Sequence, residues 1–224
     1  MRYDAVFLHV DGTLLWVSLD LGGCAEDLAP YSANGGLTVE RVTGPIWEGL
    51  RRHIRENIKH RTEEDFAAGF KRRNAAQLGI EAPVELLTEV AERRISFNPY
   101  PESEGVLQEL HAMEVPLYVV SNWDIALANV LEDFGWTDYF EGVVALAVVG
   151  VEKPEAKIFE EALRASGVDR SRAVHVGNDP LTDVQGASAA GLDTVFVDRR
   201  GAGDLQGATY AIPDLTGLPE IVEG

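Results

Sequence analysis

Cysteine and long hydrophobic runs are nearly absent from this sequence of 224 residues, whose one cysteine is Cys24. A single thiol cannot form an internal disulfide, so a reducing compartment is expected. No apolar run is long enough to span a bilayer, and the start, MRYDAVFLHV, lacks the basic head, apolar core and small-residue exit of a signal peptide. These absences predict a cytoplasmic protein that has no membrane partner.

Basic residues are also scarce. Lys and Arg together number 19 against 37 Asp and Glu, which gives a formal charge of −18. Such a charge repels nucleic acid and anionic membranes, so we expect no nucleic-acid partner. An anionic ligand would need a local cationic pocket. The length fits one substantial domain, or one domain that carries an insert, and the chain is compatible with a monomer or a homodimer.

Four short runs of apolar residues predict β-strands. They are nearly continuous rather than alternating, which is typical of strands buried on both faces of a parallel sheet. The runs are residues 5–10, 116–121, 173–178 and 194–199, and a short last strand is expected near 210–212. Between them, residues 102–113, 124–134 and 155–166 have helical periodicity. This alternation predicts an α/β fold with a doubly wound, Rossmann-like parallel sheet.

Residues 16–97 interrupt the alternation of strands and helices. They are typical of successive helices, at about 45–60, 63–78 and 83–95, with Pro45 in a first turn and Gly79 as a stop. No apolar run of comparable strength to the four strands lies among them. The sequence therefore predicts an α/β core made of residues 1–15 and 98–224, with an all-helical insert at 16–97.

Polar residues follow three of the predicted strands. The string HVDGT (9–13) ends the first, Ser121 and Asn122 end the second, and GND (177–179) ends the third. Asp183 lies four residues further on, and Lys153 precedes Pro154 at the head of a helix. In an open parallel sheet, ligands bind beyond the carboxyl ends of the strands. The clusters therefore predict one pocket at this edge of the sheet.

The same strings resemble, in chain order, the four motifs of the haloacid dehalogenase superfamily: DGTLL, SNWD, EKPEAKIFEEAL and HVGNDPLTDVQGASAAGL. The resemblance covers residues 3–15 and 100–220, and the insert is similar to the family's cap. It implies a hydrolase of the phosphatase type that acts with Mg²⁺ on a small phosphorylated molecule. In this family a strand-end aspartate attacks phosphorus, and a second aspartate, two residues on, transfers protons.

The resemblance also assigns roles to individual residues. The catalytic positions are His9 (the nucleophile's place), Asp11 (acid–base) and Lys153. Side chains and amides hold the phosphoryl oxygens in this family, and the matching positions are Gly12, Thr13, Ser121, Asn122 and Lys153. The positions around the metal are His9, Asp11, Asn178, Asp179 and Asp183.

Two of these positions depart from the family's pattern. His9 replaces the nucleophilic aspartate, and Asn178 replaces the first acid of the last motif. Both changes remove a carboxylate that should touch the same Mg²⁺, and imidazole and amide suit this ion less well. Asp179 could substitute for Asn178 if the loop shifts by one residue. Because no aspartyl-phosphate can form at His9, we expect the phosphatase activity to be impaired or re-purposed.

Several alternatives remain open from the sequence alone. His9 could be an inert packed histidine, a phosphoacceptor, or a ligand for a softer metal such as zinc, and the broken motif favours the first. Asp179 could cap a helix that begins at Pro180 instead of binding metal. The whole protein could be a non-catalytic relative that binds a phosphorylated ligand or a protein partner. Haloacid dehalogenation is less favoured, because it also requires a carboxylate at position 9.

Overall fold

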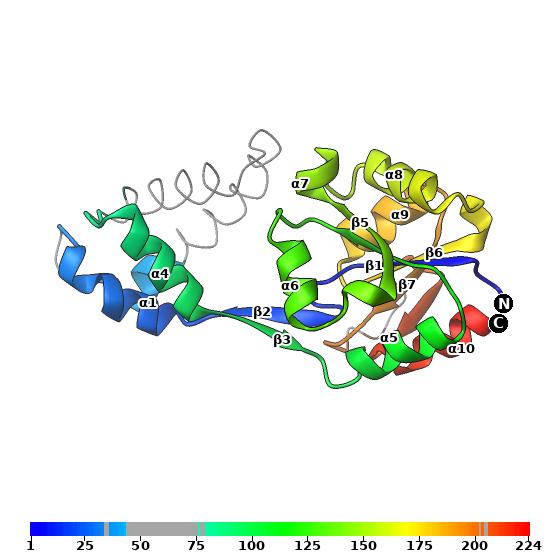
Figure 1. Ribbon diagram of the computed structural model, residues 1–224, viewed down its shortest axis with the longest axis horizontal. Coiled ribbons are helices and arrows are strands. Elements are labelled where there is room, and N and C mark those ends of the chain that lie inside the picture. Colours follow the sequence, from blue (N-terminus) through cyan, green and yellow to red (C-terminus); the bar gives the residue numbers. More distant parts are fainter. Residues whose placement is uncertain (34–35, 44–75, 77–78, 202, 204–205) are drawn as a thin grey trace. The chain divides into compact units, whose positions relative to one another are not determined.

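The computed structural model describes residues 1–33, 36–43, 76, 79–201, 203 and 206–224 (Figure 1). The chain divides into two compact units, a core unit of Met1–Trp16 with Asn98–Gly224 and an insert unit of Val17–Phe97. The helices predicted at 45–60 and 63–78 lie almost entirely outside the described residues. They stay predictions.

Six parallel strands form the sheet of the core unit, in the order β5-β4-β1-β6-β7-β8. Their bounds are β1 (Ala5–Leu8), β4 (Leu117–Ser121), β5 (Phe140–Ala145), β6 (Ala173–Gly177), β7 (Asp193–Val197) and β8 (Tyr210–Ile212). Because β1 lies between β4 and β6, the residues that follow these three strands meet at one edge of the sheet. The predicted α/β fold with a parallel sheet is confirmed.

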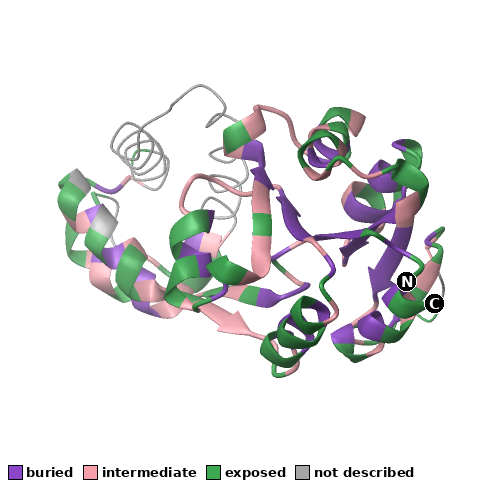
Figure 2. Cartoon of the chain, turned by 45° about the vertical axis from the view of Figure 1, so that its right-hand side comes forward, coloured by how far each residue is buried: buried purple, intermediate pink, exposed green. Residues whose placement is uncertain are grey.

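Every residue of β1, β4 and β6 is buried, which explains their continuous apolar sequences (Figure 2). Helices α8 (Ala156–Ser166) and α9 (Gly186–Ala189) pack on one face, where Phe159 and Ala187 join Phe7 and Tyr118 in one hydrophobic cluster. Helices α5 (Ser103–Ala112) and α10 (Leu218–Glu223) lie on the opposite side of the sheet (Figure 1). Burial on both faces fixes the strands, and with them the loops at their ends.

The predicted helices of the core correspond to α5, α6 (Leu127–Asp133) and α8, and a short helix α7 (Leu146–Val149) precedes α8. The edge strand β5 was not predicted. Only its last two residues are buried, and the preceding residues are exposed or partly exposed. Its sequence, FEGVVA, therefore lacks the continuous apolar run of the central strands.

The described part of the insert unit contains α1 (Leu21–Leu28) and α4 (Val84–Arg94). A two-stranded sheet of β2 (Leu15–Leu19) and β3 (Ile95–Pro99) lies where the chain leaves the core and returns to it. The prediction of an all-helical insert is wrong at its two ends, where β2 and β3 were not expected. In β2 exposed and less exposed residues alternate over only five positions. So short a segment is not distinguished from the longer helical patterns around it.

Two arginines of α4 join it to α1. Arg94 donates to Asp20 (2.7 Å) and to Asp27 (2.8 Å), and Arg93 donates to Asp27 (2.8 Å). Asp20 also caps α1, since its side chain accepts from the backbone N–H of Gly23. These charged contacts supplement the hydrophobic cluster between the two helices, which includes Cys24.

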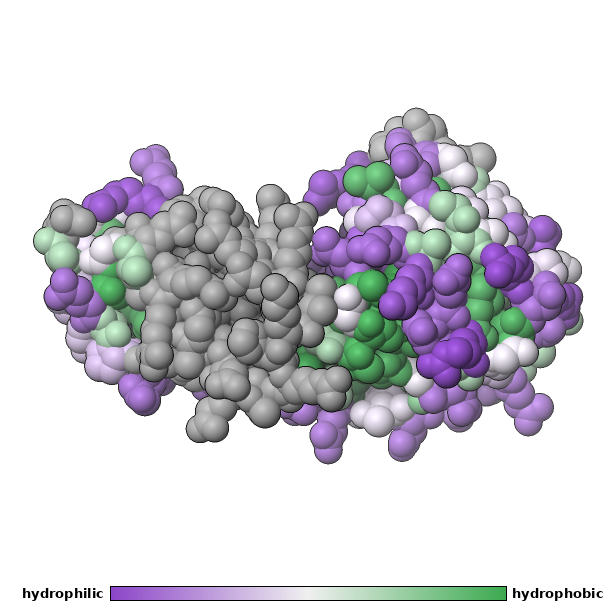
Figure 3. Space-filling model, turned by 90° about the horizontal axis from the view of Figure 1, so that it is seen from above, coloured by the Kyte–Doolittle hydropathy of each residue, from purple (hydrophilic) through white to green (hydrophobic). Residues whose placement is uncertain are grey.

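Among the described helices, none is long and apolar enough to cross a membrane. The described surface that faces the viewer in Figure 3 is mixed, with hydrophilic side chains interspersed among smaller hydrophobic areas.

Candidate active site

The loop after β1 carries the first group of predicted site residues. The backbone N–H of His9 continues the pairing with β6 by donating to Val176 O (2.9 Å), and the N–H of Thr13 then turns back to Val10 O (3.1 Å). Gly12 lies in the left-handed region at φ 81°, and a Cβ at this position would collide with the side chain of Asn178. The turn is thus tight and requires glycine.

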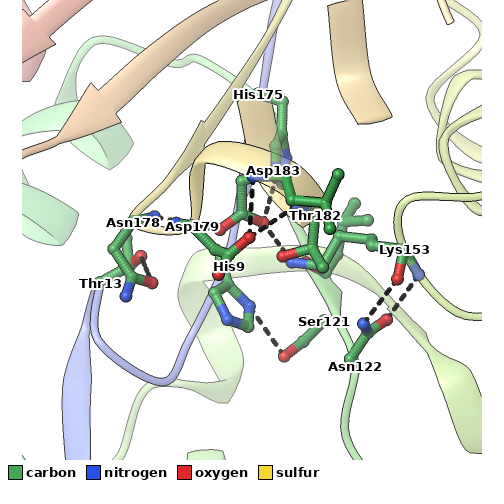
Figure 4. Close-up of polar contacts among 12 residues, drawn as sticks. His9, Thr13, Ser121, Asn122, Lys153, His175, Asn178, Asp179, Thr182 and Asp183 are labelled. Carbon is green, nitrogen blue, oxygen red and sulfur yellow. Dashed lines mark hydrogen bonds and ion pairs between the residues drawn. The ribbon is translucent and has the colours of Figure 1, made fainter. Parts of the chain in front are cut away.

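His9 and Ser121 are in direct contact. Ser121 Oγ lies 3.1 Å from His9 Nδ1, so the ends of β1 and β4 are joined by a hydrogen bond (Figure 4). Ser121 is fully buried, and His9 is partly exposed. Desolvation, and then the nearby positive charge of Lys153, lower the pKa of His9 to about 3. The imidazole is therefore neutral at neutral pH.

Lys153 reaches the same group of side chains from the loop before α8. Its ammonium is buried and donates to Val120 O (3.2 Å) and to Asp183 Oδ1 (2.5 Å). Burial lowers the pKa of Lys153, while the contact with Asp183 opposes that shift. The ammonium has three N–H donors, and these two acceptors account for two of them.

The side chain of Asn122 makes a contact that the sequence did not indicate. Its Nδ2 donates to Lys153 O (3.0 Å) and its Oδ1 accepts from Lys153 N (2.7 Å), so the side-chain amide holds the backbone of Lys153 on both sides. A cis peptide bond joins Lys153 to Pro154. Asn122 is therefore a positioning residue for Lys153 in this structure.

Asp183 is the most heavily bonded side chain of the site. Its Oδ1 accepts from Lys153 and from His175 Nε2 (3.0 Å), and its Oδ2 accepts from the backbone N–H groups of Asn178 and Asp179 (3.0 Å each). Burial alone would raise the pKa of Asp183, but the charge of Lys153 and the hydrogen bond from His175 hold it well below its usual value. Asp183 thus ties the ends of β6 and of the Lys153 loop together.

Asp179 and Asn178 are also engaged within the loop after β6. Asp179 Oδ1 accepts from the N–H groups of Leu181 (2.9 Å) and Thr182 (2.7 Å), so it caps the π-helical turn η5 (Pro180–Gln185). Asn178 Oδ1 accepts from Thr13 Oγ1 (3.2 Å), which joins this loop to the one after β1. Hydrogen bonds therefore join Thr13 and Lys153 to the last motif, and the His9–Ser121 pair lies at the ends of the neighbouring strands β1 and β4.

Two residues of the site were not predicted. His175 lies in β6, and its Nε2–H donates to Asp183 Oδ1 (3.0 Å). Arg199 follows β7, donates to Gly12 O (3.3 Å) and Thr13 O (2.7 Å), and stacks on Tyr100 at 3.4 Å from the ring centroid. Nothing in the string VDRRG distinguishes Arg199 from its exposed neighbour Arg200, so the sequence carried no signal for it.

Asp11 is exposed at the edge of this network. Burial is the main cause that raises the pKa of Tyr100, and the negative charge of Asp11 adds to that shift. The predicted proton-transfer residue therefore lies beside the tight turn at Gly12 and on the solvent side of the buried network.

Two of the predicted metal-binding positions, His9 and Asn178, carry side chains that suit a magnesium ion poorly. Imidazole nitrogen is a poor ligand for this hard cation, and the one side-chain oxygen of Asn178 already accepts from Thr13. Both oxygens of Asp183 accept the hydrogen bonds described above, and Asp179 uses Oδ1 to cap η5. Within the described parts of the chain, no three His, Cys, Asp or Glu side chains are grouped so that they could hold a metal ion.

Comparisons with known proteins agree with this architecture. A family model described as haloacid dehalogenase-like hydrolase matches residues 3–191. The haloacid dehalogenase-like hydrolase domain-containing protein 3 of Mus musculus is 36% identical over 95 residues, and this match spans 42% of the chain and 38% of the relative. A glyceraldehyde 3-phosphate phosphatase of Methanothermobacter thermautotrophicus is 38% identical over 199 residues, which cover 87% of the chain and 85% of the relative.

Among solved structures, a 2-haloacid dehalogenase from Pseudomonas syringae pv. Tomato superposes with a TM-score of 0.68 at 26% identity, over 99% of this chain and 98% of the other. The match of a family model over most of the core, the parallel sheet and the four motifs in their order lead to one conclusion. This chain belongs to the haloacid dehalogenase-like hydrolase family.

Proposed function

We propose that this protein binds the phosphoryl group of a small phosphate monoester at the network of Ser121 and Lys153, and that the family's aspartyl-phosphate route is closed in it. The observation that carries the proposal is the contact between Ser121 Oγ and His9 Nδ1. An imidazole stands against the phosphate-binding hydroxyl, in the place where the nucleophilic carboxylate is required.

The binding half of the proposal rests on the groups that the chain retains. Ser121 ends β4, and the ammonium of Lys153 donates to the carbonyl of the preceding Val120, so both buried groups lie at the carboxyl edge of the sheet. Hydroxyl and ammonium groups suit phosphoryl oxygens. The similarity to a glyceraldehyde 3-phosphate phosphatase over most of both chains supports a small phosphorylated metabolite as the ligand class.

The second part of the proposal, that the aspartyl-phosphate route is closed, rests on the absence of a carboxylate at position 9. Asp11 remains as a proton donor and acceptor, but a proton-transfer residue without a nucleophile gives no covalent intermediate. Binding of this kind leaves affinity without turnover. Hydrolytic dehalogenation has less support, although a dehalogenase is among the similar structures, because that reaction also needs a carboxylate at position 9.

A paired assay tests this proposal. The protein and its His9→Asp and His9→Asp/Asn178→Asp variants are assayed with Mg²⁺ on a panel of phosphate esters, including a triose phosphate and a nucleoside monophosphate. We expect little turnover by the unaltered protein and a rise in the variants, largest in the double variant because both carboxylates return. Adding Asp11→Asn to the double variant, as a control, is expected to abolish the gain.

Substantial turnover by the unaltered protein that His9→Asp leaves unchanged or lowers would overturn the proposal. It would indicate a phosphohistidine route, which mass spectrometry of the acid-labile phosphoprotein would reveal.

A further inference from the structure

Two adjoining positions of the candidate site carry neutral side chains where the family has carboxylates. They are His9, at the end of β1, and Asn178, at the end of β6, and β1 and β6 are neighbouring strands. A pair of carboxylates here repels a phosphate dianion, and a divalent cation must offset that repulsion. With neutral groups at both positions, the repulsion that requires the cation is removed.

The orientation of Asn178 adds hydrogen-bond donors at this corner. Thr13 Oγ1 donates to Asn178 Oδ1, so the oxygen of the amide faces Thr13 and the NH₂ group lies over Gly12. Among the described residues, Nδ2 of Asn178 has no acceptor. A carboxylate at this position would present an oxygen where this amide presents two N–H groups.

The pair of His9 and Ser121 supplies a further donor in either tautomer. A neutral imidazole and a hydroxyl carry two exchangeable protons, and their mutual hydrogen bond uses one. If the Ser121 hydroxyl donates to Nδ1, the second proton is on Nε2 of His9 and is available to a ligand. If instead Nδ1–H donates to Ser121 Oγ, the hydroxyl proton of Ser121 is available. Lys153 adds its third N–H, beyond those that bind Val120 O and Asp183.

We propose that this site binds a phosphate-type oxyanion directly, without a divalent cation, through Asn178 Nδ2, the His9–Ser121 pair and Lys153. The inference rests on the proposed function and deepens it, since it replaces the metal of the family by hydrogen-bond donors of this chain. In this proposal His9 and Asn178 together replace the family's two metal-binding carboxylates with neutral side chains that form hydrogen bonds.

Isothermal titration with orthophosphate tests the inference. The unaltered protein is titrated once in EDTA and once in Mg²⁺, and we expect the two dissociation constants to agree within about twofold. Asn178→Asp, which keeps the shape of the side chain, is expected to weaken binding in EDTA by about tenfold or more. In His9→Asp/Asn178→Asp, binding is expected to depend on Mg²⁺. The control is Lys157→Met, an exposed position on α8 whose change is expected to have no effect.

The possible results separate the two proposals. Phosphate binding by the unaltered protein that strengthens tenfold or more with Mg²⁺ would overturn the inference and leave the proposed function standing. The inference also fails if Asn178→Asp binds phosphate in EDTA as tightly as the unaltered protein, with circular dichroism showing that the variant is folded. Absence of phosphate binding under both conditions would overturn the proposed function itself.

Discussion

Nδ1 of His9 lies 3.1 Å from Ser121 Oγ, so the side chain at the predicted nucleophile position is hydrogen-bonded to the side chain predicted to bind phosphate. Burial and Lys153 keep this imidazole neutral, with a pKa of about 3. A neutral ring is compatible with the adjacent ammonium, which a protonated ring would repel. The neutral imidazole of His9 is therefore both hydrogen-bonded to Ser121 and compatible with the charge of Lys153.

Lys153→Met is expected to destabilise the protein strongly. Lys153 and Asp183 form an ion pair whose side chains are 0% and 1% exposed, and removal of the lysine leaves the carboxylate buried without its charged partner. Breaking one half of a buried pair costs about 3–5 kcal/mol. Urea unfolding measures the change, and phosphate titration of the folded variant is expected to show weaker binding.

Two further variants make that prediction specific. Lys153→Met/Asp183→Asn is expected to recover part of the lost stability, because the amide carries no charge and still accepts from Asn178 N and Asp179 N. Lys157→Met serves as the exposed control. Equal losses in the single and double variants would show that the ion pair is not the source of the effect.

The central strands and the edge where the site forms could be predicted from the sequence, because both depend on local patterns. Strands buried on both faces leave continuous apolar runs, and the parallel order places the ends of β1, β4 and β6 together. The motif residues His9, Ser121 and Lys153 consequently fell at one edge in the prediction and in the structure.

The hydrogen-bond partner of each polar side chain could not be predicted from the sequence. The side-chain amide of Asn122 contacts the backbone of Lys153, 31 residues away, and the sequence did not indicate this pairing. Arg199 contacts Gly12 from 187 residues away, and such a long-range choice depends on the folded sheet rather than on neighbouring letters. The strands β2 and β3 were not predicted for a related reason. Each is short and is stabilised by pairing with the other, which lies far away in the sequence.

Asp27→Asn is expected to lower stability at neutral pH and to lose that effect in acid. Hydrogen bonds from Arg94 and then Arg93 lower the pKa of Asp27 from 3.8 to about 2. Because the folded state favours the ionised form, the contribution of Asp27 is complete above pH 3.8 and is lost as the pH falls from 3.8 towards 2. Urea unfolding at several pH values measures the difference between the two proteins.

Glu26→Gln, an exposed neighbour on α1, is the matched control and is expected to leave the urea midpoint at neutral pH almost unchanged. A stability difference between Asp27→Asn and the unaltered protein that stays constant from neutral pH to pH 2 would contradict the assignment to these ion pairs.

Arg199→Met is expected to weaken phosphate binding as well as stability. Arg199 donates to the carbonyls of Gly12 and Thr13, forms an ion pair with Glu102 (2.7 Å) and stacks on Tyr100. Carbonyls left without this donor cost about 1–3 kcal/mol of stability. Because the turn then relaxes away from its bound geometry, we expect phosphate affinity to fall roughly tenfold. Urea unfolding and isothermal titration measure the two effects.

Arg200→Met, at the exposed neighbouring position, is the matched control and is expected to change neither quantity. Arg199→Lys is expected to fall between the control and Arg199→Met, because lysine keeps the charge but lacks the planar group that reaches two carbonyls while it stacks on a ring. If Arg199→Met loses stability but binds phosphate with unchanged affinity, then Arg199 supports the fold alone. A parallel loss of affinity, graded from Lys to Met, would instead show that it positions the Gly12 turn for the ligand.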